Sequence, residues 1–253
     1  MIYYMLSKSQ INSIKSLQHK KFRHEQGFFL VEGSKSIVEF ANSPYEIDTV
    51  YYTTTFDSKV LNLSQKINWC EISVNDLEKI SSLKTPQEVI AKIRIPQWPL
   101  PGKKELEGKF SLVLDGVQDP GNLGTIIRIA DWFGIGHIIC SPDTVDSYNP
   151  KVVQASMGSL SRVRIYDTEL PAFLAALKLP VFGALLDGAN IYDTDFGHEG
   201  LIILGNEGNG IRSEVEALVS RAVTIPRIGR AESLNVGIAT ALFCSEITRN
   251  TKK

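Results

Sequence analysis

The sequence lacks the features that mark metal-binding, disulfide-bonded and membrane proteins. Its three cysteines, Cys70, Cys140 and Cys244, are odd in number and far apart, so neither a disulfide framework nor a zinc-ligand spacing is visible. The four histidines form no metal pattern either. No segment approaches the roughly 18 consecutive apolar residues of a membrane span, and the apolar start is too short for a signal peptide. We expect a cytoplasmic protein with no metal site and no membrane partner.

The chain also lacks an excess of charge of either sign. Its formal net charge is −1, so global electrostatics give no argument for nucleic-acid binding, and any such contact must come from a local basic patch. Hydrophobic residues make up 43% of the chain, which is enough for an ordinary folded core. A length of 253 residues suits one large domain or two modest ones.

A linker between two domains is expected at residues 97–109. Prolines and glycines surround the charged run Lys103-Lys104-Glu105 there, without apolar periodicity, which is typical of a linker. The expected domains are therefore residues 1–96 and residues 110–253.

Helical and strand patterns alternate in the first of these parts. Apolar spacing and runs of β-branched or aromatic residues predict a small α/β domain. Its helices are expected around 11–17 and at 34–41, 57–66 and 74–83, and its strands at 28–31, 47–53, 69–72 and 88–95.

In the second part, short apolar strands alternate with helices. This pattern predicts an α/β fold with a parallel sheet covered by helices on both faces. The strands are expected at 112–117, 137–140, 163–166, 181–186, 201–205 and 222–225. Helices are expected at 125–133, where Gly134 provides a C-terminal stop, from Pro150 onwards, and at 234–247.

Three segments of the second part follow expected strands and are more polar than a simple connection requires. The first, from Asp119 to Gly124, is predicted to be a turn; it contains Asn122 and is followed by Arg128 on the next helix. Ligands bind at the carboxyl ends of parallel strands, where this segment lies. Glycine lets the backbone approach a ligand closely, and asparagine can bond a ligand or the backbone. Arg128 either extends its charge to solvent or belongs to a site.

The second segment runs from Gly205 to Gly210 and has three glycines and two asparagines around Glu207. It matches neither the G-x-G-x-x-G dinucleotide pattern nor a phosphate-binding P-loop, and the carboxylate of Glu207 would repel a phosphate. An uncharged or cationic polar ligand fits better. A long turn that binds nothing is the alternative.

The third segment runs from Ile225 to Val236. Ser233 can cap the helix that follows it. Capping by Ser233 does not explain why Asn235, a poor helix former, stands beside it in the first turn.

Together, these segments resemble the SpoU/TrmH family of RNA 2′-O-ribose methyltransferases, within the knotted SPOUT superfamily. The resemblance covers about residues 110–248 and rests on Asn122-x5-Arg128, Gly205-Asn206-Glu207-Gly208 and Ser233-Leu234-Asn235-Val236, in that order. The segment Phe28-Phe29-Leu30-Val31-Glu32-Gly33, preceded by Lys20, Lys21 and Arg23, is similar to the ribosomal-protein-like substrate-binding domain of many rRNA-modifying members.

The resemblance implies a deep trefoil knot in the second domain, S-adenosylmethionine as cofactor and a ribose 2′-hydroxyl as methyl acceptor. It also implies a homodimer formed through the knotted domain. The implied catalytic residues are Asn122, Arg128, Glu207, Ser233 and Asn235. The implied cofactor-binding residues are Ala184, Leu204, Gly205, Asn206, Gly208, Ile225, Ser233, Leu234 and Asn235.

The chemistry leaves two roles open for Arg128. A ribose hydroxyl is a poor nucleophile, so its proton must leave as the methyl group transfers. A free guanidinium is a very poor base. Arg128 therefore either binds the RNA phosphate and orients the hydroxyl through charge-assisted hydrogen bonds, or acts as a base in a site that favours this.

A local basic patch is present near the amino terminus. Between Lys8 and Arg23 there are five Lys or Arg residues and no acidic residue. We assign RNA binding to Lys20, Lys21 and Arg23, with a solvated helix face as the alternative. The arginines that can extend this surface across the second domain are Arg162, Arg164, Arg212, Arg227 and Arg230.

The catalytic pattern indicates the reaction but not its target. The front domain favours 23S ribosomal RNA over transfer RNA. A non-catalytic RNA-binding or ribosome-assembly factor is the alternative from another class, and the intact polar set argues against it. A nucleotide-dependent oxidoreductase would need the dinucleotide fingerprint that is missing.

Overall fold

The computed structural model describes residues 5–61 and 67–251, and the chain forms two compact units. The first unit contains the residues up to 97 together with residues 146–161; the second contains residues 98–145 and the residues from 162 onwards. The sequence-based boundaries placed residues 110–253 in one domain. The segment 146–161 instead packs with the first unit.

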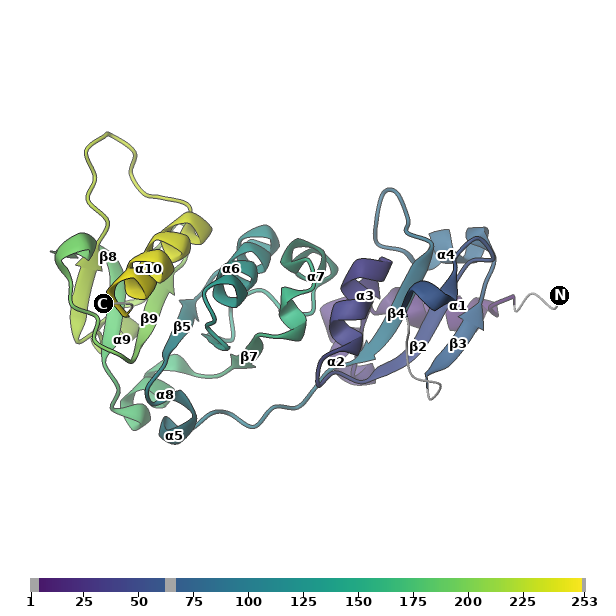
Figure 1. The fold of residues 1–253 in the computed structure, drawn as a ribbon, viewed down its shortest axis with the longest axis horizontal. Coiled ribbons are helices and arrows are strands. Elements are labelled where there is room, and N and C mark those ends of the chain that lie inside the picture. Colours follow the sequence, from purple (N-terminus) through teal and green to yellow (C-terminus); the bar gives the residue numbers. More distant parts are fainter. Residues whose placement is uncertain (1–4, 62–66, 252–253) are drawn as a thin grey trace. The chain divides into compact units, whose positions relative to one another are not determined.

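A four-stranded sheet forms the centre of the first unit (Figure 1). Its order is β1-β4-β2-β3, in which β4 is antiparallel to both neighbours and β3 is parallel to β2. The strands are β1 (Phe28–Glu32), β2 (Ile47–Tyr52), β3 (Asn68–Glu71) and β4 (Val89–Arg94). The helices are α1 (Lys8–Ser16), α2 (Lys20–Gln26), α3 (Ser34–Ala41), α4 (Val74–Ile80) and α7 (Pro150–Ser156), with 3-10 turns η1 (Ser58–Leu61) and η2 (Ser159–Ser161). Where a helix was predicted at 57–66, the structure has the 3-10 turn η1 at 58–61, and residues 62–66 lie outside the described residues.

Alternation along β1 gives the first unit a core on each face of its sheet. Successive strand residues point to opposite faces, so Leu30 joins the cluster with residues of α1 and α4. Phe29 joins the other cluster, where its ring lies 5.6 Å from Phe40 and 4.8 Å from Tyr148, centroid to centroid. Because Tyr148 belongs to the segment 146–161, that segment completes the core of the first unit.

A six-stranded sheet forms the centre of the second unit. Its order is β10-β8-β9-β5-β6-β7, and every neighbouring pair is parallel, which confirms the predicted parallel α/β fold. The strands are β5 (Phe110–Asp115), β6 (His137–Cys140), β7 (Arg164–Asp167), β8 (Val181–Asn190), β9 (Gly200–Gly205) and β10 (Arg221–Thr224). The helices are α5 (Lys103–Leu106), α6 (Pro120–Trp132), α8 (Leu170–Leu177), α9 (Ser213–Glu216) and α10 (Val236–Thr251), with the 3-10 turn η3 (Ile191–Asp193).

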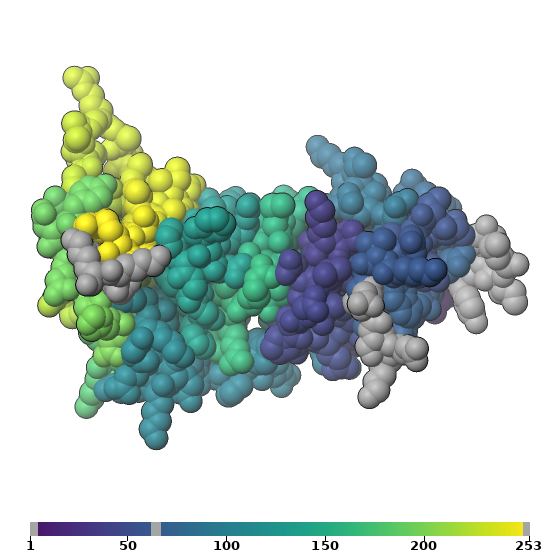
Figure 2. Space-filling view, viewed as in Figure 1, coloured from purple at the N-terminus to yellow at the C-terminus, as the bar shows by residue number. Residues whose placement is uncertain are grey.

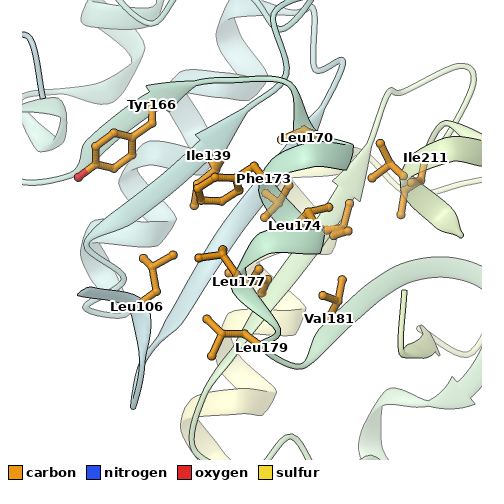
Figure 3. Close-up of a cluster of buried hydrophobic side chains, with 14 residues drawn as sticks. Leu106, Ile139, Tyr166, Leu170, Phe173, Leu174, Leu177, Leu179, Val181 and Ile211 are labelled. Atoms are coloured by element: carbon orange, nitrogen blue, oxygen red, sulfur yellow. The ribbon is translucent and has the colours of Figure 1, made fainter. Parts of the chain in front are cut away.

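Helix α8 shows how this sheet is covered. Its residues Leu170, Phe173, Leu174 and Leu177 pack against Ile139 and other side chains of the sheet in one buried cluster (Figure 3). Burying leucine and phenylalanine side chains contributes about 1.5–3 kcal/mol each. Helices α6 and α10 pack against one another (Figure 1).

Two expectations about local structure are wrong. The predicted linker contains α5, because Glu105 accepts a hydrogen bond from the Gly102 amide at 3.0 Å and Leu106 is fully buried. Helix α6 begins at Pro120 and not at Thr125. Asp119 caps it by accepting from the Asn122 amide at 2.8 Å, and proline is favourable at the first helical position.

Candidate active site

The three polar segments meet at the carboxyl end of the second sheet. Strands β5 and β9 are parallel, with Asp115 opposite Gly205, and β8 lies between β9 and β10. The chain therefore leaves β5, β9 and β10 at the same edge of the sheet, where open α/β folds bind ligands.

The loop after β9 is closed on itself by backbone and side-chain hydrogen bonds. Asn206 and Gly210 exchange two backbone bonds of 2.9 Å. The Asn206 side chain accepts from the amides of Gly208 and Asn209 and donates to the Gly116 carbonyl at 2.7 Å. A Cβ atom on Gly205 would lie 2.2 Å from the carbonyl carbon of Gly210, so only glycine fits there. Asn206 thus builds the loop with its side chain.

A cavity of about 720 Å³ lies between this loop, the middle of β8 and the segment 225–235. A volume of this size is within the range of about 300–1,000 Å³ of small-molecule sites. In Figures 1 and 2 the segment 225–235 is the yellow-green arm of the second unit, and its residues from 226 to 235 are exposed. Eight of the nine residues predicted to bind cofactor line the cavity, namely Ala184, Leu204, Gly205, Asn206, Gly208, Ile225, Ser233 and Leu234.

The ninth residue, Asn235, belongs to a hydrogen-bonded chain beside the cavity. Its Oδ1 accepts from the amides of Gly237 (2.9 Å) and Ile238 (3.3 Å), and its Nδ2 donates to Oδ1 of Asn122 at 2.9 Å. Asn122 in turn donates from Nδ2 to Oε1 of Glu207 at 2.8 Å. One residue from each of the three segments is therefore joined in a single polar chain, which we call the Asn–Asn–Glu chain.

The cap of α10 corrects the expectation for Ser233. Asn235 caps this helix, which begins at Val236, and Ser233 lies two residues further out in the exposed segment. Asn235 is therefore not a poor helix former inside the first turn; it precedes the helix, where asparagine is favoured.

Arg128 lies on the exposed side of α6. Its guanidinium forms no hydrogen bond or ion pair with any residue that the structure describes. The structure thus joins three of the five predicted catalytic residues directly and leaves Arg128 and Ser233 outside the hydrogen-bonded chain. An unpaired guanidinium is suited to an anionic ligand such as a phosphate.

An ion pair that we did not predict, between Asp115 and Arg212, lies behind the loop. Asp115, at the end of β5, is 1% exposed, and its two carboxylate oxygens accept from the Arg212 amide and from Arg212 Nε at 2.7 Å each. The hydrogen bond with Asp115 raises the pKa of Arg212 above its ordinary value. Arg212 thus anchors the chain where it leaves the loop, and it does not extend an RNA surface as expected. A charged residue closing a buried apolar strand was the available signal.

The basic patch of the first unit is also smaller than predicted. Lys20 and Lys21 are exposed on α2, but Arg23 is only 1% exposed. Its guanidinium forms an ion pair with Asp146, through Nε at 2.9 Å and through NH2, and donates to the Leu17 carbonyl at 2.9 Å. Arg23 is therefore a core residue, and its assignment to RNA binding is wrong.

The other arginines named for an RNA surface differ in their surroundings. Arg162 forms an ion pair with Asp131 at 2.8 Å, and Arg164 lies over the Trp98 ring at 5.0 Å. Arg227 and Arg230 are exposed on the segment 225–235, beside the cavity.

Two of the three cysteine thiols, those of Cys140 and Cys244, are buried. Within the described residues no group of three or more His, Cys, Asp or Glu side chains is placed to hold a metal ion. Burial raises the pKa of the Cys244 thiol to about 12 and that of Cys140 well above its ordinary value. Both thiols are therefore protonated near neutral pH. No helix in the described part of the chain is long and apolar enough to cross a membrane.

Comparison with known proteins agrees with this geometry. The model of the SpoU rRNA Methylase family matches residues 109–245, and that of the MRM3-like substrate binding domain matches residues 8–91. The 23S rRNA (guanosine(2553)-2′-O)-methyltransferase RlmP of Bacillus subtilis is 30% identical over 92% of this chain and 94% of its own length.

Two solved structures resemble the whole chain. A TrmH-family protein from Porphyromonas gingivalis superposes with a TM-score of 0.87, at 39% identity over 97% of this chain and 99% of the other. An AdoMet-bound rRNA methyltransferase from Sinorhizobium meliloti superposes with a TM-score of 0.85, at 28% identity over 98% of each chain. The fold and the three segments define an RNA methyltransferase of the SPOUT class. The chain belongs to the SpoU rRNA methylase family.

Proposed function

We propose that this protein transfers the methyl group of S-adenosylmethionine to a ribose 2′-hydroxyl of 23S ribosomal RNA. The observation that carries the proposal is the Asn–Asn–Glu chain, which joins the three family segments beside one cavity. The relatives named as 23S rRNA 2′-O-methyltransferases, among them RlmP of Bacillus subtilis, support the choice of reaction and of RNA.

The cavity fits S-adenosylmethionine in size and in chemistry. Backbone groups of Leu204, Gly205 and Ile225 and the apolar lining suit an adenosine. Glu207 lies on the cavity wall, and a carboxylate favours a cationic ligand over a phosphate. When bound, the cofactor supplies the methyl group as a sulfonium.

The residues of this chain would hold and orient the acceptor. The ribose oxygen would have to lose its proton as it gains the methyl group that the bound cofactor would supply. Arg128 is free to bind the phosphate next to the reacting ribose. To take the proton instead, its guanidinium would first have to lose one of its own. Glu207 keeps Asn122 in one orientation through the 2.8 Å hydrogen bond. Ser233 contributes a hydroxyl at the cavity rim.

The first domain, residues 1–96 with the segment 146–161 that packs on it, would bind the RNA, and the rest of residues 110–253 would catalyse the transfer. The match to a substrate-binding domain at 8–91 supports this division. Lys20 and Lys21 are exposed cations of the basic patch and would contact phosphates, which makes the affinity salt-dependent.

A homodimer formed through the second unit, in the cytoplasm, completes the proposal. Trp132 on α6 is 84% exposed and Ile238 on α10 is 55% exposed, although these two helices pack against each other. Large apolar side chains exposed on two helices that pack against each other favour a surface that a partner covers.

The proposal is tested by comparing ribosomal and transfer RNA from cells with and without the gene. One 2′-O-methyl group should be missing from 23S rRNA in the deletion strain. Loss of a ribose methylation from transfer RNA would show that transfer RNA is the substrate. Loss of a base methylation would contradict the assigned reaction. If no methyl group were lost, the protein would be an assembly factor and not a methyltransferase.

A further inference from the structure

The first unit contains a second cavity, of about 540 Å³, that lies apart from the cofactor site. Its walls are the end of β1, the first turn of α3, the loop 82–87 and one side of α7. All of these belong to the first unit, including α7 from the segment 146–161. A cavity of this volume accommodates one nucleotide.

The cavity has an apolar floor and a polar mouth. Leu30, Val31 and Val153 are buried beneath it, and Leu83 is half-buried at its side. Ser34, Ser36, Gln87 and Gln154 supply hydroxyl and amide groups around the opening. Apolar walls with a few convergent polar groups are typical of sites that recognise a flat heterocycle by stacking and edge contacts.

Met157 stands at the rim in an unusual backbone conformation. It is 65% exposed and has φ 48°, one of two non-glycine residues with positive φ in the described chain. The next residue, Gly158, lies so close to α3 that an added Cβ would be 2.8 Å from Cγ of Glu39. The contact places the exposed thioether at the cavity, and methionine sulfur makes favourable contacts with aromatic rings.

The opposite wall is held in place before any ligand arrives. The Glu32 carboxylate accepts from the Ser82 amide at 2.8 Å, from the Ser82 hydroxyl at 2.6 Å and from the Ser81 hydroxyl. Glu32 is thereby occupied by three donors, and the loop that carries Leu83 is tied to the end of β1. A preformed wall lowers the entropic cost of binding.

Lys35 is the cation at the mouth of the cavity; it is exposed and forms no ion pair with any described residue. Two carboxylates also line the cavity: Glu32 is occupied by its three donors, and Glu39 is exposed and lies against Gly158. Lys84 and Lys151 are exposed next to lining residues. These lysines favour a ligand that carries a phosphate.

We propose that this cavity holds one unpaired nucleotide of the substrate RNA, with its base against Met157 and the apolar floor and its phosphate beside Lys35. The inference rests on the proposed function, since it takes RNA as the substrate. It gives the first unit a means to select RNA that has a bulged or looped-out nucleotide, because a paired base cannot enter.

The test uses the full chain and a 23S rRNA transcript. Met157→Gly removes the thioether and suits the positive φ, so the fold should be as stable as before or more so. Lys178→Gly is the matched control, because Lys178 is the other non-glycine residue with positive φ (53°) and caps α8 in the second unit. Met157→Gly should weaken RNA binding at least about fivefold, as expected for loss of one base contact, and the control should not.

Lys35→Ala should also weaken RNA binding. The slope of log affinity against log salt concentration should become shallower by about 1, which corresponds to one phosphate contact. Transcripts containing 4-thiouridine should crosslink to the residues around 30–36 or 150–157.

Wild-type affinity in both variants, with no crosslink to these residues, would overturn the inference. If the wild-type chain methylates the transcript in that case, only the cavity assignment fails; if it neither binds nor methylates the transcript, the proposed function fails as well. Weaker binding of the variants to ribosomal particles alone would point to a protein partner and would also overturn it.

Discussion

Asn235 donates a hydrogen bond from Nδ2 to Oδ1 of Asn122 at 2.9 Å, across 113 residues of sequence. Its own Oδ1 is committed to capping α10, so its amide can face Asn122 in one orientation only. Asn122 must then turn its Nδ2 towards Glu207. The cap of α10 thereby sets the direction of both side-chain hydrogen bonds in the Asn–Asn–Glu chain.

Replacing Asn235 with aspartate should separate capping from this orientation. Aspartate caps as well as asparagine, so the melting temperature of Asn235→Asp should stay near that of the wild type. Its second oxygen would accept from Asn122, which would turn and present its own oxygen to Glu207. We expect the methylation rate to fall about 100-fold, in line with the loss of one preorganised polar group.

Asn190→Asp is the matched control for this variant. Asn190 caps η3 by accepting from the Tyr192 amide at 3.1 Å and does not line the cavity. It should methylate at the wild-type rate. Full activity in Asn235→Asp would show that the direction of the hydrogen bonds is unimportant.

The Asp115–Arg212 pair should stabilise the loop that follows β9. Arg212→Ala leaves the buried Asp115 carboxylate without its side-chain partner, which should cost about 1–3 kcal/mol of unfolding free energy. The loop exit would loosen, so cofactor affinity measured by calorimetry should also fall. Arg162→Ala removes an ion pair with Asp131 that is more exposed; it should cost less than about 1 kcal/mol and leave cofactor binding unchanged. Equal effects of the two variants would contradict this role.

The residues of the basic patch should divide into two kinds. The double variant Lys20→Ala, Lys21→Ala should weaken RNA binding and leave thermal stability unchanged. The slope of log affinity against log salt concentration should become shallower by about 1–2, as expected for the loss of one or two phosphate contacts. Arg23→Ala should destabilise the first unit by about 3–5 kcal/mol, because Asp146 would be left buried and unpaired. Salt titrations and thermal melts distinguish these outcomes. A stable Arg23→Ala variant with weakened RNA binding would restore the sequence-based assignment.

Trp132 and Ile238 should lie in the dimer interface. Trp132→Asp with Ile238→Asp should convert the protein to a monomer in sedimentation experiments, because each charge would be buried in the interface. Val74→Asp changes a side chain of the first unit that is also 55% exposed and serves as the control. A wild-type protein that sediments as a monomer would exclude the dimer.

Local patterns in the sequence predicted most strands and helices, and the family resemblance supplied the site residues. Errors arose where a local pattern has two solutions. Proline and glycine after Asp119 suggested a turn, yet Asp119 and Pro120 together start a helix. Arg23 resembled its basic neighbours, and its partner Asp146 lies 123 residues away. The Asp115–Arg212 pair spans 97 residues. Pairings at such distances depend on the tertiary fold, so a local pattern does not identify the partner.

The most direct test of the account compares the wild type with Arg128→Ala, using purified protein, S-adenosylmethionine labelled in its methyl group and 23S rRNA. The wild type should place the label on the 2′-oxygen of one ribose. Arg128→Ala should bind cofactor with unchanged affinity and lose methyl transfer by about 1,000-fold or more, since Arg128 has no partner in the described structure and its guanidinium is assigned to the substrate. Label on a base, or transfer by Arg128→Ala at the wild-type rate, would contradict the account.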